Sequence, residues 1–276
     1  MNRLKDRVAL VTGGASGLGA ETCLLFAEQG ADIVVADLND ERGAEVVRGV
    51  EARGRKAVFH HTDVAKSDDL EAAVRLAEET FGKLDTVVAN AGIGGAASRK
   101  RLEDLSEEQM DEVIQVNMSG VWRTFKFAAP ALRRAGGGSM TSSASVAGQT
   151  ILGGSTLGGY TASKFGAVGL TKFFAAELAA DGIRVNCVCP GRMQTNIDES
   201  YHWSAEELEE ARRRRQGAVN TVMRTMAEPR EVAYLHLFLC SDEASFITGQ
   251  SIEADGGLNL FMNKAGLVTE TPLDQA

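Results

Sequence analysis

A glycine-rich turn at residues 12–19 places the strongest constraint on how this chain can fold. The turn reads TGGASGLG; the apolar run VALVT leads into it, and a helical pattern follows it. Glycines at such a turn allow positive φ, let the backbone approach a pyrophosphate, and let the helix pack close to the strand. The helix N-terminus then presents free N–H groups and the positive end of its dipole to phosphates. The sequence therefore predicts an α/β protein that binds a dinucleotide.

The spacing of the glycines qualifies this prediction. Gly13, Gly17 and Gly19 follow the pattern G-x3-G-x-G, whereas the usual dinucleotide fingerprint is G-x-G-x-x-G. The motif therefore matches that fingerprint in its strand–turn–helix context and not in its letters. No Lys-Ser or Lys-Thr follows the glycines, which argues against an NTP-hydrolysing P-loop. We expect Ser16 and Leu18 to join the three glycines in binding the cofactor.

An acidic residue ends the second apolar run. Asp37 lies 18 residues beyond Gly19, close to the spacing of about 20 expected for the carboxylate that binds the adenosine ribose. A carboxylate there repels a 2′-phosphate, and no Lys or Arg stands at positions 15, 16 or 18 to attract one. We therefore predict that the cofactor is NAD, with Asp37 and Leu38 at its adenosine end. The alternative is that Asp37 is a solvated acid that begins a turn.

Short apolar runs alternate with amphipathic segments along most of the chain. This alternation predicts right-handed βαβ units and a parallel sheet with helices on both faces. The sequence Asp69–Phe81 is one such helix. We read residues 1–260 as one domain, with a substrate-binding segment at 192–227 and a tail at 261–276. The expected strands are Val8–Thr12, Asp32–Asp37, Lys56–His61, Leu84–Asn90, Ser139–Ser143, Arg184–Val188 and Gln250–Ala254.

Charge and composition exclude several classes of partner. The chain has 276 residues, with 29 Lys and Arg against 38 Asp and Glu, a net charge of −9. Binding to nucleic acid needs a basic face, so we expect no nucleic-acid partner. No apolar run approaches a membrane span or a signal-peptide core, and we expect no membrane partner and a cytoplasmic protein. The four cysteines lack partners at metal-ligand spacing, so we expect small buried side chains and no metal site.

Together these motifs resemble the short-chain dehydrogenase/reductase family, in its compact single-domain branch. The resemblance covers residues 4–258 and rests on seven motifs in the order of the family. It implies a doubly wound Rossmann-type fold with a seven-stranded parallel sheet, commonly assembled as a homotetramer or a dimer. The motifs are TGGASGLG at 12–19, Asp63-Val64, Asn90-Ala91-Gly92, Asn117, Ser145, Tyr160-x3-Lys164, and Pro190-Gly191 with Thr195.

The resemblance implies a role for each catalytic residue. Tyr160 would exchange the hydroxyl proton, Lys164 would tune Tyr160 and bind the nicotinamide ribose, and Ser145 would orient the substrate oxygen. Asn117 would keep a water at Lys164. Independently, Tyr160 and Lys164 stand four apart and share one helix face. An ammonium near a phenol favours the phenolate, whose pKa is otherwise near 10.

The resemblance also implies further contacts with the cofactor. Asp63 and Val64 would meet the adenine, and Asn90 and Gly92 the adenosine side. The backbone around Pro190, Gly191 and Met193, with the Thr195 hydroxyl, would hold the nicotinamide amide. Ser145 is chosen over Ser142 and Ser143 because the family pattern puts the catalytic serine before two small residues and a glycine, as in Ser145-Val146-Ala147-Gly148.

The predicted function is an NAD-dependent oxidoreductase that interconverts a secondary alcohol and a ketone. Two alternatives stay open: a carbonyl reductase that uses NADH, and a catalytically silent NAD-binding sensor. Two basic runs, 99–101 and 212–215, border the predicted substrate site and suggest an anionic substrate. For the second run a solvated helix face, paired with the glutamates at 206–210, is the favoured alternative. The apolar residues of the tail suggest that it docks on a surface, and disorder beyond Glu270 is the alternative.

Overall fold

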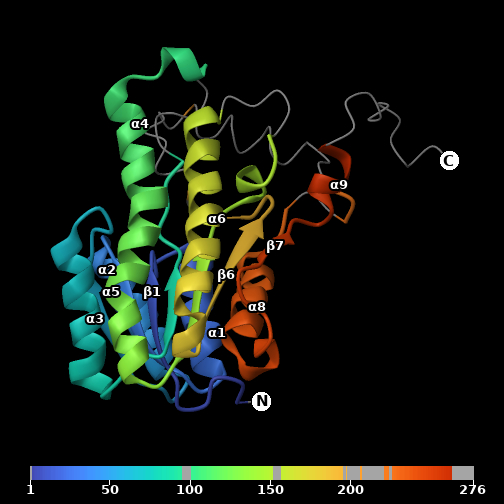
Figure 1. Ribbon diagram of the computed structural model, residues 1–276. Helices are drawn as coiled ribbons and strands as arrows, with labels where there is room; N and C mark the ends of the chain where they lie inside the picture. Colours follow the sequence, from blue (N-terminus) through green and yellow to red (C-terminus); the bar gives the residue numbers. More distant parts are fainter. Residues whose placement is uncertain are drawn as a thin grey trace.

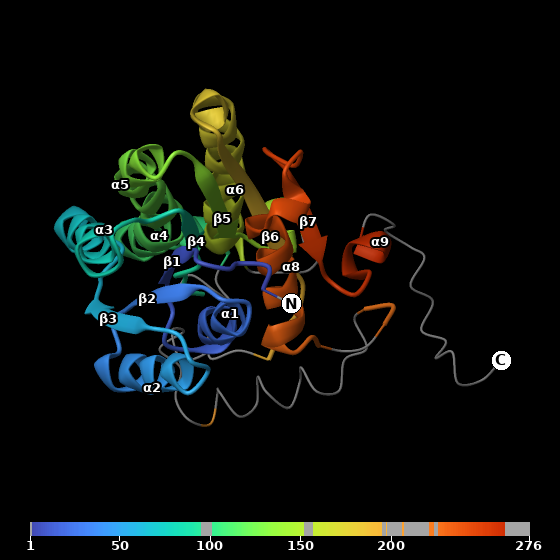
Figure 2. The same cartoon turned by 90° about the horizontal axis from the view of Figure 1, so that it is seen from below.

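The computed structural model describes residues 2–94, 101–151, 157–194, 197, 206, 221–223 and 226–262. Seven parallel strands form one sheet with helices packed around it (Figure 1), in the order β3-β2-β1-β4-β5-β6-β7 (Figure 2). The strands are β1 Val8–Thr12, β2 Asp32–Asp37, β3 Ala57–His61, β4 Thr86–Ala89, β5 Gly138–Ser143, β6 Ile183–Pro190 and β7 Ser251–Ala254. The helices of four or more residues are α1 Gly17–Glu28, α2 Asp40–Glu51, α3 Ser67–Phe81, α4 Glu107–Ile114, α5 Gly120–Arg134, α6 Gly158–Leu178, α8 Pro229–Cys240 and α9 Leu258–Met262, with a π-helical turn, η2, at Gln115–Ser119.

The strand order confirms the predicted doubly wound fold. From β1 the chain proceeds outward through β2 to β3, and it then returns to the other side of β1 and proceeds from β4 to β7. The order reverses between β1 and β4, which are hydrogen-bonded neighbours. In open parallel sheets, ligands bind at the carboxyl ends of the strands at such a reversal. The fold therefore directs attention to the ends of β1, β4 and β5.

Helices cover both faces of the sheet, and each face has its own apolar cluster. Figure 2 shows α3, α5 and α6 on one side of the sheet and α1, α2 and α8 on the other. Along β1, Val8 and Leu10 belong to the first cluster, while Ala9 and Val11 belong to the second. Strands that are buried on both faces need apolar side chains at every position. This is why β1 and β2 read as mostly apolar runs in the sequence, whereas β5, GSMTSS, is buried although it is mostly polar.

The starts of β3 to β7 differ from the prediction by one or two residues, and two carboxyl ends differ for clear physical reasons. β4 ends at Ala89 because the next two N–H groups, of Asn90 and Ala91, donate to the Thr12 hydroxyl at 3.1 and 3.2 Å and leave the sheet. β6 extends two residues past the predicted end, because β7 pairs with it as far as Pro190. Proline lacks an N–H and is tolerated at a strand end.

Short 3₁₀ turns in the described part of the chain are η1 Leu102–Asp104, η3 Val146–Gly148, η4 Ala179–Asp181 and η6 Asp242–Ala244. The four cysteines are buried and free, as predicted. Within the described ranges, no helix combines the length and apolarity needed to cross a membrane. Residues 263–276 of the predicted tail lie outside the described residues.

Candidate active site

The glycine loop has the backbone geometry that only glycine adopts easily. Gly13 and Gly17 have φ values of +63° and +49°. A Cβ on Gly19 would lie 1.9 Å from the Gly13 carbonyl oxygen, which is far inside contact distance. Ser16 precedes α1 and makes no side-chain capping hydrogen bond. The loop therefore brings its backbone close together at the start of an uncapped helix, as a pyrophosphate site requires.

Asp37 closes this loop at the end of β2. One of its carboxylate oxygens accepts from the backbone N–H of Ala15, inside the loop, at 2.9 Å, and the other accepts from Asn39 N–H at 3.0 Å. Each oxygen retains capacity for a further hydrogen bond. The neighbouring Leu38 is 59% exposed. Asp37 and the glycine loop are thus brought together, and both can face one ligand.

Asn90 joins the end of β4 to the glycine loop. Its side-chain Nδ2 donates to the Gly13 carbonyl at 3.1 Å. Its side-chain Oδ1 accepts from the Ser143 hydroxyl, at the end of β5, at 2.9 Å. The carboxamide of Asn90 therefore bridges two strand ends across the reversal of strand order.

Tyr160 and Lys164 lie one turn apart near the start of α6. The Lys164 Nζ is 5.4 Å from the centre of the Tyr160 ring and donates to the Ser143 carbonyl at 2.9 Å. Lys164 is only 3% exposed. Burial lowers the pKa of Lys164 from 10.5 to about 8. At neutral pH the buried side chain is therefore still mostly an ammonium beside the phenol.

Asn117 lies fully buried in the π-helical turn between α4 and α5. Its Oδ1 accepts from Ile93 N–H at 2.8 Å, and its Nδ2 donates to the Ile93 carbonyl at 2.9 Å. Nδ2 also lies 3.1 Å from the Ser163 hydroxyl on α6. A Cβ on Gly92 would meet both Asn117 Oδ1, at 3.2 Å, and Lys164 Nζ, at 3.3 Å. The side chain of Asn117 thus fixes the segment after β4 against α6, next to Lys164.

The three candidate serines have different surroundings. Ser142 and Ser143 are buried, and their hydroxyls are engaged with Thr171 and with Asn90 respectively. Ser145 is partly exposed, and its oxygen accepts from Ala147 N–H at 3.1 Å. Among the described residues no group accepts its hydroxyl hydrogen, which can therefore be donated to a substrate oxygen. The choice of Ser145 as the catalytic serine stays a prediction.

The remaining predicted cofactor contacts lie along the same edge of the sheet. Asp63 follows β3, where its Oδ1 accepts from Ala65 N–H at 2.9 Å, and Val64 beside it is buried. Pro190 ends β6, and the next residue, Gly191, comes so close to Asp255 that a Cβ would lie 2.7 Å from the Asp255 Cα. Met193 forms an isolated bridge with Ala227. Thr195 lies outside the described residues.

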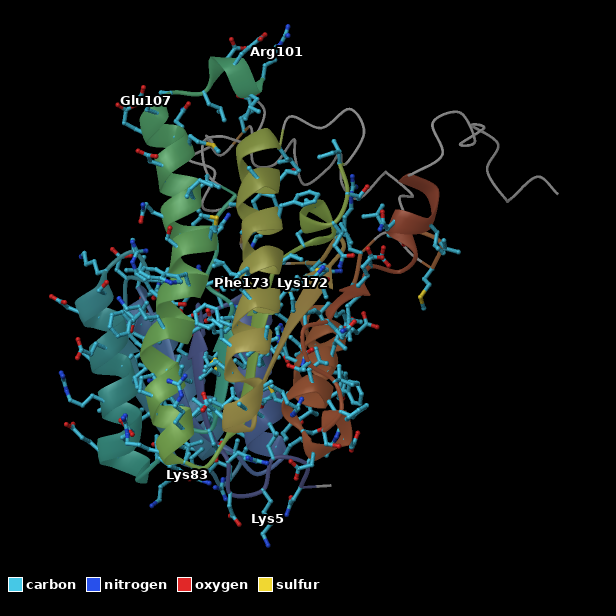
Figure 3. All side chains as sticks on the ribbon, viewed as in Figure 1. Lys5, Lys83, Arg101, Glu107, Lys172 and Phe173 are labelled. Carbon is cyan, nitrogen blue, oxygen red and sulfur yellow. The ribbon has the colours of Figure 1, made fainter. Side chains whose placement is uncertain are left out.

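The basic runs are described only in part. Residues 99, 100 and 212–215 lie outside the described residues. Arg101, at the end of the molecule toward which the strands point (Figure 3), pairs with Glu103 at 2.6 Å. An anionic substrate therefore stays a prediction.

Sequence reasoning missed one group of polar residues beside the site. His236 on α8 is fully buried, and its two ring nitrogens lie 2.9 Å from the Thr141 hydroxyl and 3.1 Å from the Ser143 hydroxyl. The sequence does contain a signal, since a single histidine interrupts the apolar helix AYLHLFLC. Its partners Thr141 and Ser143 lie on the same face of β5, because side chains two residues apart on a strand point to the same side.

Comparison with known proteins identifies the family. A family model described as enoyl-(acyl carrier protein) reductase matches residues 13–259. The chain is 39% identical over 255 residues to cyclohexanol dehydrogenase of Acinetobacter sp. (strain SE19), covering 92% of this chain and 96% of that protein.

Solved structures agree with this match. Carveol dehydrogenase of Mycobacterium avium, solved in complex with NAD, is similar with a TM-score of 0.83 and 29% identity, over 94% of this chain and all of that one. Levodione reductase is similar with a TM-score of 0.84 and 30% identity, over 93% of this chain and 99% of that one. The chain therefore belongs to the short-chain dehydrogenase/reductase family and is an oxidoreductase of that type.

Proposed function

We propose that this protein interconverts a secondary alcohol and a ketone with NAD as its cofactor. One observation carries the proposal: the buried Lys164 ammonium lies beside the Tyr160 ring, with its Nζ 5.4 Å from the ring centre. A cation held out of water next to a phenol favours the phenolate. Tyr160 is therefore suited to accept and return a proton near neutral pH, as a general acid–base catalyst must.

The roles of the protein groups follow from this arrangement. When an alcohol is oxidised, its hydroxyl proton passes to the Tyr160 phenolate as the carbon–hydrogen bond breaks. Ser145 donates its free hydroxyl hydrogen to the substrate oxygen and orients it. Bound NAD supplies the acceptor for the hydride. Reduction of a ketone is the reverse sequence, in which Tyr160 donates the proton.

The glycine loop and Asp37 support NAD as the cofactor. The close approach of Gly13 and Gly19 leaves the loop backbone open to a pyrophosphate. The Asp37 carboxylate, held on Ala15 of the same loop, suits the two ribose hydroxyls and repels a 2′-phosphate. The similar carveol dehydrogenase was solved with NAD.

The named relatives narrow the substrate class. Cyclohexanol and carveol dehydrogenases are named for cyclic secondary alcohols, and levodione reductase for a ketone. We propose a cyclic secondary alcohol or the matching ketone as the substrate. A screen of cyclic alcohols with NAD, and of cyclic ketones with NADH, would identify the substrate and the favoured direction.

Replacement of Tyr160 tests the reaction. Tyr160→Phe keeps the ring and removes the proton-transferring hydroxyl, so kcat on the best alcohol is expected to fall at least about 100-fold. The Kd for NAD, measured by calorimetry, should change little. Tyr234→Phe, on the exposed surface of α8, is the matched control and should keep wild-type turnover. Near-normal kcat in Tyr160→Phe would refute the proposed mechanism.

The choice of cofactor has its own test at Asp37. A 2′-phosphate next to this carboxylate loses about 1 kcal/mol or more to repulsion and about 1.5–3 kcal/mol in lost hydrogen bonds. We expect wild type to prefer NAD over NADP by roughly a hundredfold or more in kcat/KM. Asp37→Ala should lower kcat/KM with NAD and reduce the difference in kcat/KM between NAD and NADP. Leu38→Arg should raise kcat/KM with NADP. Equal use of both cofactors by wild type would show that Asp37 does not contact the ribose.

A further inference from the structure

Four polar side chains form a cluster in the mostly apolar layer between the sheet and α8. Thr141 and Ser143 extend from β5, and His236 and Cys240 extend from α8. All four side chains are almost completely buried. Their contacts are 2.9 Å from Thr141 Oγ1 to His236 Nδ1, 3.1 Å from Ser143 Oγ to His236 Nε2, and 3.8 Å from Thr141 Oγ1 to Cys240 Sγ. Apolar residues would fill this space at no polar cost, so a cluster of this kind invites a functional explanation.

The donor and acceptor of each hydrogen bond to His236 can be assigned from its neighbours. The Ser143 hydroxyl donates its single hydrogen to Asn90 Oδ1, so it must accept from the Nε2–H of His236. Burial lowers the pKa of His236 to about 3, so its ring is neutral. A neutral ring that carries its hydrogen on Nε2 has a free lone pair on Nδ1. That nitrogen accepts from the Thr141 hydroxyl.

The chain of hydrogen bonds ends on the glycine loop. Asn90 receives the Ser143 hydrogen on Oδ1, which leaves its Nδ2 to donate to the Gly13 carbonyl at 3.1 Å. On its other side the same carbonyl abuts Gly19, where a Cβ would lie 1.9 Å away. The Gly13 carbonyl is therefore held between Asn90 and Gly19. A rotation of the Asn90 carboxamide would put two oxygens against each other.

We propose that His236 is a positioning residue for the cofactor site: through Ser143 and Asn90 it fixes the Gly13 carbonyl and the start of the glycine loop. This inference rests on the proposed function, because it assumes that the loop binds the cofactor. Ser143 is the central residue of the arrangement. Its carbonyl accepts from Lys164 on one side, and its hydroxyl connects to His236 on the other.

A triple variant separates positioning from stability. Thr141→Val, Ser143→Ala and His236→Leu together replace the imidazole and both of its hydroxyl partners by apolar groups, which is close to neutral for folding because none of the three is left orphaned. Asn90 Oδ1 loses its donor, but Asn90 is only partly buried, which limits the cost. We expect a Tm within a few degrees of wild type. The Kd for NAD should rise about fivefold to tenfold, as the loss of one fixed hydrogen bond implies. Because Tyr160 and Lys164 are unchanged, KM for NAD should rise while kcat at saturating NAD stays within about twofold.

A second measurement and a control complete the experiment. In the protein without cofactor, hydrogen exchange in peptides covering residues 12–20 should be faster in the triple variant than in wild type. Ser142→Ala with Thr171→Val removes a buried hydroxyl pair, 2.8 Å apart, on the opposite face of the same strand. This control should change neither the exchange of residues 12–20 nor the Kd for NAD.

The outcomes distinguish this inference from the proposed function. A triple variant with wild-type exchange and wild-type NAD affinity would overturn the inference and leave the proposed function intact. A wild-type protein that binds no nicotinamide nucleotide would overturn the proposed function, and this inference with it. Slower turnover without weaker NAD binding would also count against a positioning role.

Discussion

Each face of the sheet at β5 carries one buried titratable side chain, and the two side chains differ in charge at neutral pH. On the α6 face Lys164 donates to the Ser143 carbonyl, and on the α8 face His236 hydrogen-bonds to the Ser143 hydroxyl. Both side chains are at most 3% exposed. Burial lowers both pKa values, that of Lys164 to about 8 and that of His236 to about 3. At pH 7 the protein therefore keeps a cation on one face and a neutral ring on the other.

The two buried groups differ in what they cost the folded state. A buried cation is unfavourable for folding, because it has lost its hydration. In the part of the chain that the structure describes, no carboxylate compensates Lys164, and its ammonium donates to the backbone carbonyl of Ser143. A neutral histidine with both nitrogens satisfied has no such penalty. We infer that the charge on the α6 face is retained for the proton transfer proposed at Tyr160, whereas the neutral ring on the α8 face only positions its hydrogen-bond partners.

The largest expected effect comes from removing that charge. Lys164→Met should lower kcat at least about a thousandfold, within the range that acid–base catalysis supplies. The same variant should be more stable. A pKa lowered from 10.5 to about 8 corresponds to a cost of about 3 kcal/mol for the buried charge, which the substitution removes. The substitution also loses the hydrogen bond to the Ser143 carbonyl, which offsets about 1 kcal/mol of this gain in stability. Thermal unfolding should therefore show a Tm higher by several degrees.

Lys172→Met is the control for this variant. Lys172 lies on the same helix but is exposed on its outer side (Figure 3). Its replacement should leave both kcat and Tm close to wild type. A Lys164→Met protein that is less stable than wild type would mean that the buried ammonium supports the fold, and the contrast between the two faces would fail.

The sequence predicts best those features that depend on neighbours along the chain. The first two strands have the predicted ends, and Tyr160 and Lys164 share a helix face because they stand four residues apart. The glycine loop was predictable because its requirements are local: positive φ at positions 13 and 17, and a close backbone contact at position 19.

Features that depend on distant partners were not predictable. The π-helical turn at Asn117 accompanies two hydrogen bonds to Ile93, 24 residues away, and the helical pattern around it is uninterrupted in the sequence. The interaction of His236 with Thr141 spans 95 residues. A lone histidine in an apolar helix indicates a buried polar partner, but nothing in a single sequence says which hydroxyl it will meet.

A smaller effect, on stability alone, is expected from the α8 face in acid. The pKa of His236 is about 3 in the folded protein, against about 6.5 in the unfolded chain. Between these values the unfolded chain binds a proton that the folded protein does not, so stability falls as pH falls through this window. At pH 4 the loss relative to pH 7 amounts to about 3 kcal/mol from this one residue. The variant with Thr141→Val, Ser143→Ala and His236→Leu lacks the imidazole, and its loss of unfolding free energy between pH 7 and 4 should be smaller by that amount.

Urea unfolding of both proteins at the two pH values measures the difference. The control with Ser142→Ala and Thr171→Val should lose as much unfolding free energy as wild type. Equal acid losses in wild type and the triple variant would show that His236 takes up its proton in the folded state, and that the α8 face tolerates a charge as the α6 face does.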